Sequence, residues 1–109
     1  MQSPLTPDAA ELIARRFLAL SDPTRLRLVD LLRTRGEASV GELAGALGGS
    51  QQNVSKHLAT LYAEGFVSRR KQGTSSIYAI ADPAVFDLCE QVCGGIEAQL
   101  GQLERTLGG

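Results

Sequence analysis

Residues 50–61, with the sequence SQQNVSKHLATL, carry the strongest structural signal in this chain. Val54, Leu58 and Leu61 recur at helical spacing, so the stretch is predicted to be a helix with one face turned to a core. The other face lacks the Glu–Lys pairs of an ordinary solvated helix. Amide side chains can pair with adenine, and small side chains let a helix enter the major groove of DNA. This outward face comprises Gln51, Gln52, Ser55, Lys56 and Ala59.

The preceding segment completes a two-helix pattern. Residues 40–47 have apolar side chains at helical spacing, and the segment stops at Gly48-Gly49, where glycine can adopt a left-handed turn. Ser50 is a suitable N-cap for the next helix. The pattern predicts a helix-turn-helix in which residues 50–63 form the recognition helix. Any helical hairpin could show the same pattern, so DNA binding is a hypothesis at this point.

A predicted β-hairpin follows the recognition helix directly. Residues 66–80 place β-branched and aromatic side chains in two short strands around a Gln72-Gly73 turn. The cations Arg69, Arg70 and Lys71 lie in a row just before the tip. A run of charges is more often a solvated surface than a binding site. After a recognition helix, however, a basic hairpin is placed to act as a wing that contacts phosphates or the minor groove.

Length and charge fit a small domain. The chain has 109 residues, 43% of them hydrophobic, and a formal net charge of −1, which predicts one domain over residues 1–109. The charge is segregated along the chain. Residues 56–71 contain four lysines and arginines, together with His57, against Glu64 alone, whereas residues 82–104 contain acids and no Lys or Arg. A local basic patch is enough for phosphate contacts, so we expect moderate DNA affinity with a clear salt dependence.

The sequence contains no recognisable targeting, membrane or catalytic motif. The first eight residues lack the apolar core of a signal peptide, and no stretch approaches the roughly 20 apolar residues of a membrane span. We therefore expect a cytoplasmic protein with no membrane partner, whose cysteines rest as thiols. The sequence has one histidine, and it shows neither a phosphate-binding glycine loop nor a pair of acids suited to catalysis. We therefore do not expect an enzyme.

Three further helices are predicted around this central unit. The first covers about residues 7–20. The second has Asp22 as N-cap and Pro23 in its first turn, and it ends at Gly36. A long last helix covers residues 83–107. The expected fold is therefore mainly α with a β-hairpin wing: a winged helix-turn-helix of five helices and a two-stranded wing.

Three motifs resemble the ArsR/SmtB family of bacterial winged-helix repressors, in the family's order. The run ALSDPTRLRLVDLL at residues 19–32 is similar to its second-helix signature, residues 50–61 to its recognition helix, and residues 64–78 to its wing. The resemblance covers about residues 12–100. It implies a homodimer that binds an inverted repeat in promoter DNA, often its own promoter, and releases it when an inducer binds.

The candidate DNA contacts follow from the outward face of the recognition helix and from the resemblance to the family. For His57 a second interpretation stays open, in which the ring only packs against the domain or touches a phosphate. The candidates are Ser50, Gln51, Gln52, Asn53, Ser55, Lys56 and His57 in the recognition helix, and Arg69, Arg70 and Lys71 in the wing.

The last helix is predicted to form the dimer interface. Its apolar stripe needs a partner beyond the core of so small a domain, and the expected partners are the first helix and the symmetry mate. A two-fold axis would place the recognition helices about one DNA turn apart, roughly 34–36 Å. Gly94-Gly95 marks either a close helix approach or a kink. The expected interface residues are Val85, Val92, Ile96, Leu100 and Leu103.

Two cysteines in this helix raise the question of an inducer. Cys89 and Cys93 are four residues apart, so both thiols are expected on one helix face. Four thiols near a dimer axis suit a thiophilic metal or metalloid ion, or a switch driven by an oxidant or persulfide. Cysteine is also a common small buried hydrophobe, which leaves a structural role open.

Departures from the family pattern narrow the metal chemistry. The segment SVGELAG at residues 39–45 has no cysteine, although many metal-sensing members carry a cysteine-rich motif there. The family's zinc site on the last helix uses Asp, His, His and Glu. Asp82 can match the first ligand, but Ala84 and Gly95 stand where the two histidines would be. A sensed metal is therefore expected at the two cysteines. The alternatives are a regulator without an inducer or with an organic one, whose cysteines are structural, and a winged-helix module that binds proteins.

Overall fold

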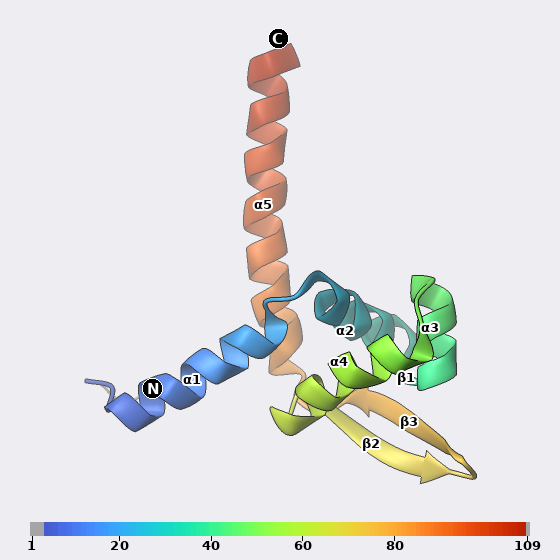
Figure 1. Ribbon diagram of the computed structural model, residues 1–109. Helices are drawn as coiled ribbons and strands as arrows, with labels where there is room; N and C mark the ends of the chain where they lie inside the picture. The colour runs from blue at the N-terminus through green and yellow to red at the C-terminus, as the bar shows by residue number, and fades with distance from the viewer. Residues whose placement is uncertain (1–3, 109) are drawn as a thin grey trace.

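The computed structural model describes residues 4–108, apart from several side chains of the last helix. Figure 1 shows the order of the elements along the chain. The described elements are α1 (Pro7–Leu20), α2 (Pro23–Arg35), β1 (Glu37–Ser39), α3 (Val40–Leu47), α4 (Gln51–Ala63), β2 (Val67–Gln72), β3 (Ser75–Ile80) and α5 (Ala84–Gly108).

Polar caps explain where the helices begin. The carboxylate of Asp22 accepts a hydrogen bond from the backbone N–H of Arg25 at 3.0 Å, which caps α2. Ser39 and Glu42 form a reciprocal capping box at the start of α3. Ser50 caps α4 through its hydroxyl. The predicted caps at Asp22 and Ser50 are therefore confirmed.

Two of these caps use carboxylates, so the stability of the fold is expected to change with pH in the acid range. The backbone N–H of Arg25 holds the pKa of Asp22 below its ordinary value, and the backbone N–H of Ser39 does the same for the pKa of Glu42. A carboxylate with a lowered folded pKa stabilises the fold above its ordinary pKa, and this stabilisation is lost as pH falls through the folded value. We therefore expect the free energy of unfolding to decrease below about pH 4.

The variant Asp22→Asn isolates the contribution of one cap, because asparagine still caps a helix but does not titrate. Urea unfolding at neutral pH and near pH 3, at one protein concentration, measures the loss. The variant should lose less stability than the wild type over this interval. An equal loss in both proteins would contradict the assignment to Asp22.

The wing belongs to a three-stranded antiparallel sheet in the described part of the chain, with strand order β1-β3-β2. The sequence predicts the two strands of the wing, but it does not predict β1 as a third strand of the sheet. This strand has three residues, which begin after Gly36, the C-cap of α2, and end at Ser39, the N-cap of α3, so its sequence is too short to show alternation. Its pairing with β3 ties the wing to the helical body.

The hairpin turn lies one residue later than predicted. The register pairs Gln72 with Ser75, which leaves Gly73 and Thr74 as the two loop residues. Gly73 has φ of +63°, a conformation that glycine adopts at little cost and that suits a tight hairpin loop.

The core lies between α2, α3, α4 and the sheet. Val54, Leu58 and Leu61 are 1%, 0% and 0% exposed, so the predicted inner face of the recognition helix is confirmed. Leu28 and Leu32 of α2 meet them in the same cluster. These contacts fix α4 on the body and leave its other face outward.

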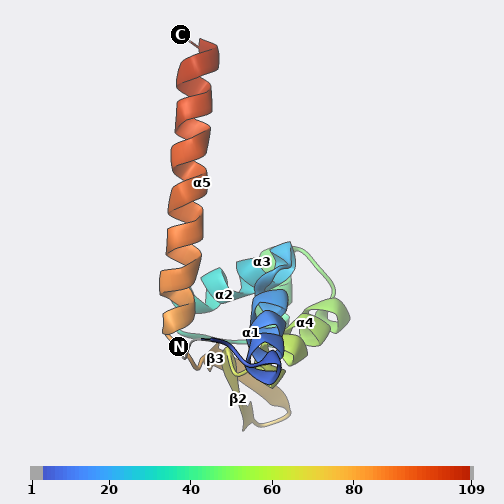
Figure 2. The same ribbon diagram turned by 90° about the vertical axis from the view of Figure 1, so that its left-hand side faces the viewer.

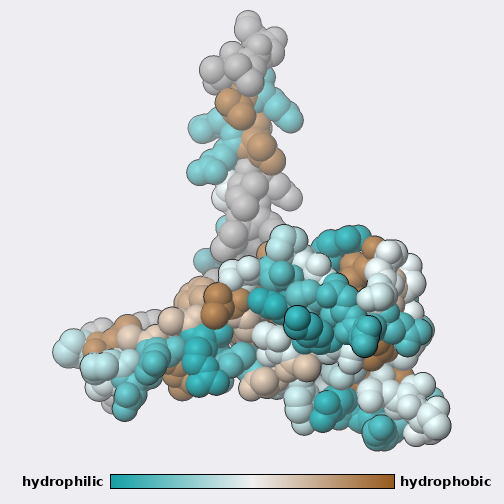
Figure 3. Space-filling model, in the orientation of Figure 1, coloured by the Kyte–Doolittle hydropathy of each residue, from teal (hydrophilic) through white to brown (hydrophobic). Residues whose placement is uncertain are grey.

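The helix α5 projects from this body, and α1 extends away in another direction (Figures 1 and 2). Leu100 and Leu103 of α5 are each 53% exposed, and hydrophobic residues mark the projecting part of α5 in Figure 3. Val85 differs from the expectation. It is 2% exposed within the protomer, because it packs into the protomer's own core, and so it leaves almost no surface for a partner.

The side chains of Val92 and Ile96 lie outside the described residues, so their place at an interface stays a prediction. None of the described helices has the length and hydropathy needed to cross a membrane.

Candidate nucleic-acid interface

The outer face of α4 is open and polar. The candidate contacts Gln51, Gln52, Asn53, Ser55 and Lys56 are all exposed. Their exposure follows from helical periodicity, because the opposite side of the helix is anchored in the core. Ser50 lies at the N-terminus of the helix, where its hydroxyl already accepts a backbone hydrogen bond.

An open polar groove of about 650 Å³ separates this helix from the tip of the wing. The side chains around it carry hydroxyls and amides, which are donors suited to phosphate oxygens. The hydroxyls of the hairpin tip and the start of α3 are not predictable from the sequence, because these segments meet α4 only in the folded chain. The groove is lined by Ser39, Val40, Gly41, Gln51, Gln52, Ser55, Thr74, Ser75 and Ser76.

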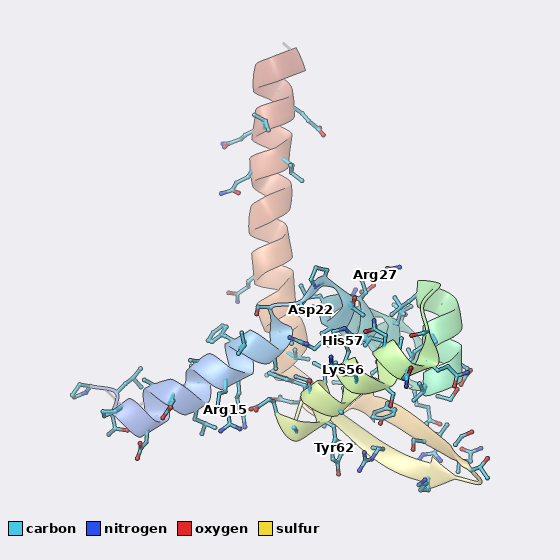
Figure 4. All side chains as sticks on the ribbon, viewed as in Figure 1. Arg15, Asp22, Arg27, Lys56, His57 and Tyr62 are labelled. Carbon is cyan, nitrogen blue, oxygen red and sulfur yellow. The ribbon has the colours of Figure 1, made fainter. Side chains whose placement is uncertain are left out.

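The three wing cations are not equivalent. Side chains alternate along a strand, so Arg69 and Lys71 share the face of buried Val67, and Arg70 lies on the opposite face. The guanidinium of Arg69 in β2 lies 4.3 Å from the centre of the ring of Tyr62 in α4. This is a cation–π contact between the strand and the helix. Figure 4 shows Tyr62 between α4 and β2. Arg69 and Lys71 therefore belong to the inner face of the wing.

Arg70 is engaged on the outer face of the sheet. Its guanidinium lies 2.7 Å from the carboxylate of Glu37 in β1 and donates to the side-chain oxygen of Gln72 at 2.9 Å. The Glu37 carboxylate compensates its charge locally. The basic run in the sequence thus separates into two inward cations and one paired outward cation.

Tyr62 is a site residue that the sequence pattern does not predict. It is 43% exposed in the last turn of α4, and its ring supports Arg69. An aromatic residue at the end of a helix is not by itself a signal. The pairing exists because β2 returns beside α4.

His57 is turned toward the body of the protein. Its side chain is 17% exposed, and its Nδ1 lies 3.2 Å from Nη1 of Arg25 and 3.8 Å from the carboxylate of Asp22. Figure 4 shows His57 and Asp22 together where α1, α2 and α4 meet. Of the two interpretations of this residue, its geometry favours packing over an outward DNA contact.

Cys89 and Cys93 lie within α5, but their side chains lie outside the described residues. Among the side chains that the structure describes, no three from His, Cys, Asp and Glu gather into a group that could hold a metal ion.

Comparison with known proteins identifies the family. Residues 20–70 match the model of a helix-turn-helix domain. The "Transcriptional repressor SmtB homolog" of Synechocystis sp. is 37% identical over 90 residues, which cover 83% of this chain and 67% of that protein. This chain belongs to the ArsR/SmtB family. The predicted winged helix-turn-helix is also confirmed, since a solved domain from Mycobacterium bovis has the same fold.

A solved structure and a second curated protein are also similar to this chain. The homodimeric winged helix-turn-helix DNA-binding domain of Mycobacterium bovis has a TM-score of 0.72 and 32% identity, and the match covers 89% of this chain and 91% of that one. The "Probable mercury resistance operon repressor" of Streptomyces lividans is 45% identical over 75 residues. That match covers 69% of this chain but 59% of the relative's length.

Proposed function

We propose that this ArsR/SmtB protein is a homodimeric transcriptional repressor that binds an inverted repeat in promoter DNA and leaves it when an inducer reaches α5. The observation that carries the proposal is the open polar face of α4 beside the inward cations of the wing. The face of α4 suits base edges in the major groove, and the wing suits the flanking phosphates.

Each protomer would divide these tasks between two elements. Gln51, Gln52 and Ser55 offer amides and a hydroxyl to base edges, while Lys56 adds a positive charge on the same helix. Arg69 and Lys71 then neutralise phosphates beside the groove. Phosphate contacts supply much of the affinity, and base contacts supply the sequence preference.

Dimerisation is supported by unpartnered apolar side chains on both projecting helices. Leu12 and Phe17 of α1 are 50% and 56% exposed, and Leu100 and Leu103 of α5 are also open. Such exposure is costly on a monomer unless a partner covers it. The homodimeric state of the M. bovis relative supports the same arrangement.

The inducer is proposed to act on Cys89 and Cys93. Their spacing in α5 suits two thiolates on one helix face, and the similarity to a mercury resistance repressor supports a thiophilic metal or metalloid ion. Binding would repack the α5 helices at the dimer axis and reduce the population with DNA-competent spacing. A coupling of about 1–3 kcal/mol would weaken DNA binding about 5- to 150-fold.

The test of DNA binding is fluorescence anisotropy of the reduced, full-length protein with labelled DNA from upstream of its own gene. Random DNA of equal length is the control, and both are measured over a series of salt concentrations. Specific binding with a steep salt dependence supports the proposal. Equal, weak binding to both DNAs would contradict a sequence-specific repressor and would favour the protein-interaction alternative.

The inducer is tested by titrating the protein–DNA complex with mercury(II), arsenic(III) and a disulfide-forming oxidant. The double variant Cys89→Ser, Cys93→Ser contains no cysteine, since the chain has two. We expect it to bind DNA like the wild type and to lose the response. Release of both proteins by the same agent would refute the thiol sensor. Binding that no agent changes would assign the cysteines a structural role.

A further inference from the structure

One arginine joins three helices at the base of the recognition helix. Arg25 lies in the first turn of α2, and its Nε and Nη2 donate to the carbonyl oxygens of Ala19 and Leu18 at the end of α1, the latter at 3.2 Å. Its Nη1 lies 3.2 Å from Nδ1 of His57 in α4. The side chain therefore contacts α1 and α4 while its backbone belongs to α2.

The chemistry of these groups explains why arginine occupies the position. The last carbonyls of a helix have no partner within the helix and need donors from outside. A guanidinium holds several N–H donors in a rigid plane, so it can serve carbonyls of one element and an imidazole of another at the same time. The lysine ammonium is a point charge on a flexible stem and cannot hold that geometry.

The contact with Arg25 selects one tautomer of the neutral imidazole. A guanidinium can only donate, so a hydrogen bond from Arg25 makes Nδ1 of His57 the acceptor and leaves the proton of the neutral ring on Nε2. The carboxylate of Asp22, 3.8 Å from Nδ1, lies beside this contact and caps α2. The junction is half-buried, which restricts the rotation of His57.

The position of this junction gives it a consequence for DNA recognition. The helix α1 carries exposed Leu12 and Phe17, part of the proposed dimer surface, and α4 carries the proposed base contacts. We infer that Arg25 is a positioning residue for DNA recognition, which holds α4 at a fixed angle to α1 so that both recognition helices of the dimer enter successive major grooves. This inference rests on the proposed function.

The contact itself can be tested without DNA. His57 is the one histidine of the chain, so its ring nitrogens give a single assignable set of signals in an ¹⁵N NMR spectrum. The wild type should show the Nε2–H tautomer. Arg25→Met keeps the length of the side chain without its donors and should shift the population toward a mixture of tautomers. An unchanged spectrum would overturn the inference.

The effect on recognition is measured by the affinity for upstream DNA and for random DNA. We expect Arg25→Met to weaken specific binding by about tenfold, the scale of losing one base-pair contact, and to change random binding by less than about twofold. Arg25→Lys should show the same loss with the charge retained. The matched control is Arg27→Met, because Arg27 is exposed on the same helix and makes none of these contacts.

A double-mutant cycle separates this role from a direct contact of His57 with DNA. If Arg25 acts through His57, then Arg25→Met with His57→Leu should bind about as weakly as the weaker single variant. Additive losses, or equal losses on random DNA, would overturn the inference. Thermal unfolding shows whether each variant is folded at the assay temperature. If Arg25→Met is not folded, the DNA affinity of Arg25→Lys is the measurement that tests the inference. A wild type without specific binding would instead refute the proposed function.

Discussion

Replacing Arg69 and Lys71 together by alanine is expected to weaken binding to upstream DNA by about two to three powers of ten near physiological salt. Both side chains lie on the inner face of the wing, and a dimer would lose four phosphate contacts. Each contact releases close to one counterion, which is worth about fivefold in affinity near 0.15 M salt. The slope of log affinity against log salt should fall by about 3 to 4.

The matched control is Arg70→Ala, which removes a cation from the same strand but from the outer face. Its charge is already paired with Glu37, so we expect a change of less than about threefold and a salt slope close to that of the wild type. Anisotropy titrations at several salt concentrations measure both quantities. Comparable losses in the two variants would show that the wing does not present its inner face to DNA.

Leu58→Ala is expected to cost about 2–5 kcal/mol of unfolding free energy. Leu58 is 0% exposed on the inner face of α4, where it packs with Leu28 and Leu32 of α2. Truncation removes buried methyl groups and leaves a cavity that the close-packed surroundings cannot fill. The total free energy of unfolding of a domain of this size is about 5–15 kcal/mol, so the variant would lose a large part of its stability.

Urea unfolding at a fixed protein concentration measures this loss, since dimerisation makes the midpoint depend on concentration. Leu58→Met nearly conserves volume and should cost less than about 1.5 kcal/mol. For Leu58→Ala, the urea midpoint should fall while the slope of the unfolding free energy against urea concentration stays unchanged. A loss below about 1 kcal/mol for Leu58→Ala would mean that α4 is held mainly by other contacts.

The helices and the outer face of α4 could be derived from local sequence. Val54, Leu58 and Leu61 specify which side of the helix is buried, because period and burial are linked within one element. Asp22 and Ser50 specify where helices start, since a cap bonds to a backbone N–H three residues away. Three motifs in the family's order were enough to identify the family before any contact was known.

The division of labour among the charged residues could not be derived in the same way. Three adjacent cations look alike in a sequence, but strand alternation and the neighbours supplied by α4 and β1 separate Arg69 from Arg70. The strand β1 is stable because β3 offers it backbone partners, not because its three residues favour a strand. Val85 appeared to belong to an outer stripe, yet the body of the domain already covers it.

The junction of Arg25 with His57 shows the same limit most clearly, because 32 residues separate its partners along the chain. Hydrogen bonds within a helix or a cap connect near neighbours, so the amino-acid pattern alone predicts them. Contacts between a guanidinium, an imidazole and the end of another helix depend on how three helices pack. That packing minimises exposed apolar surface over the whole domain, and polar partners are selected only once it has brought them within reach.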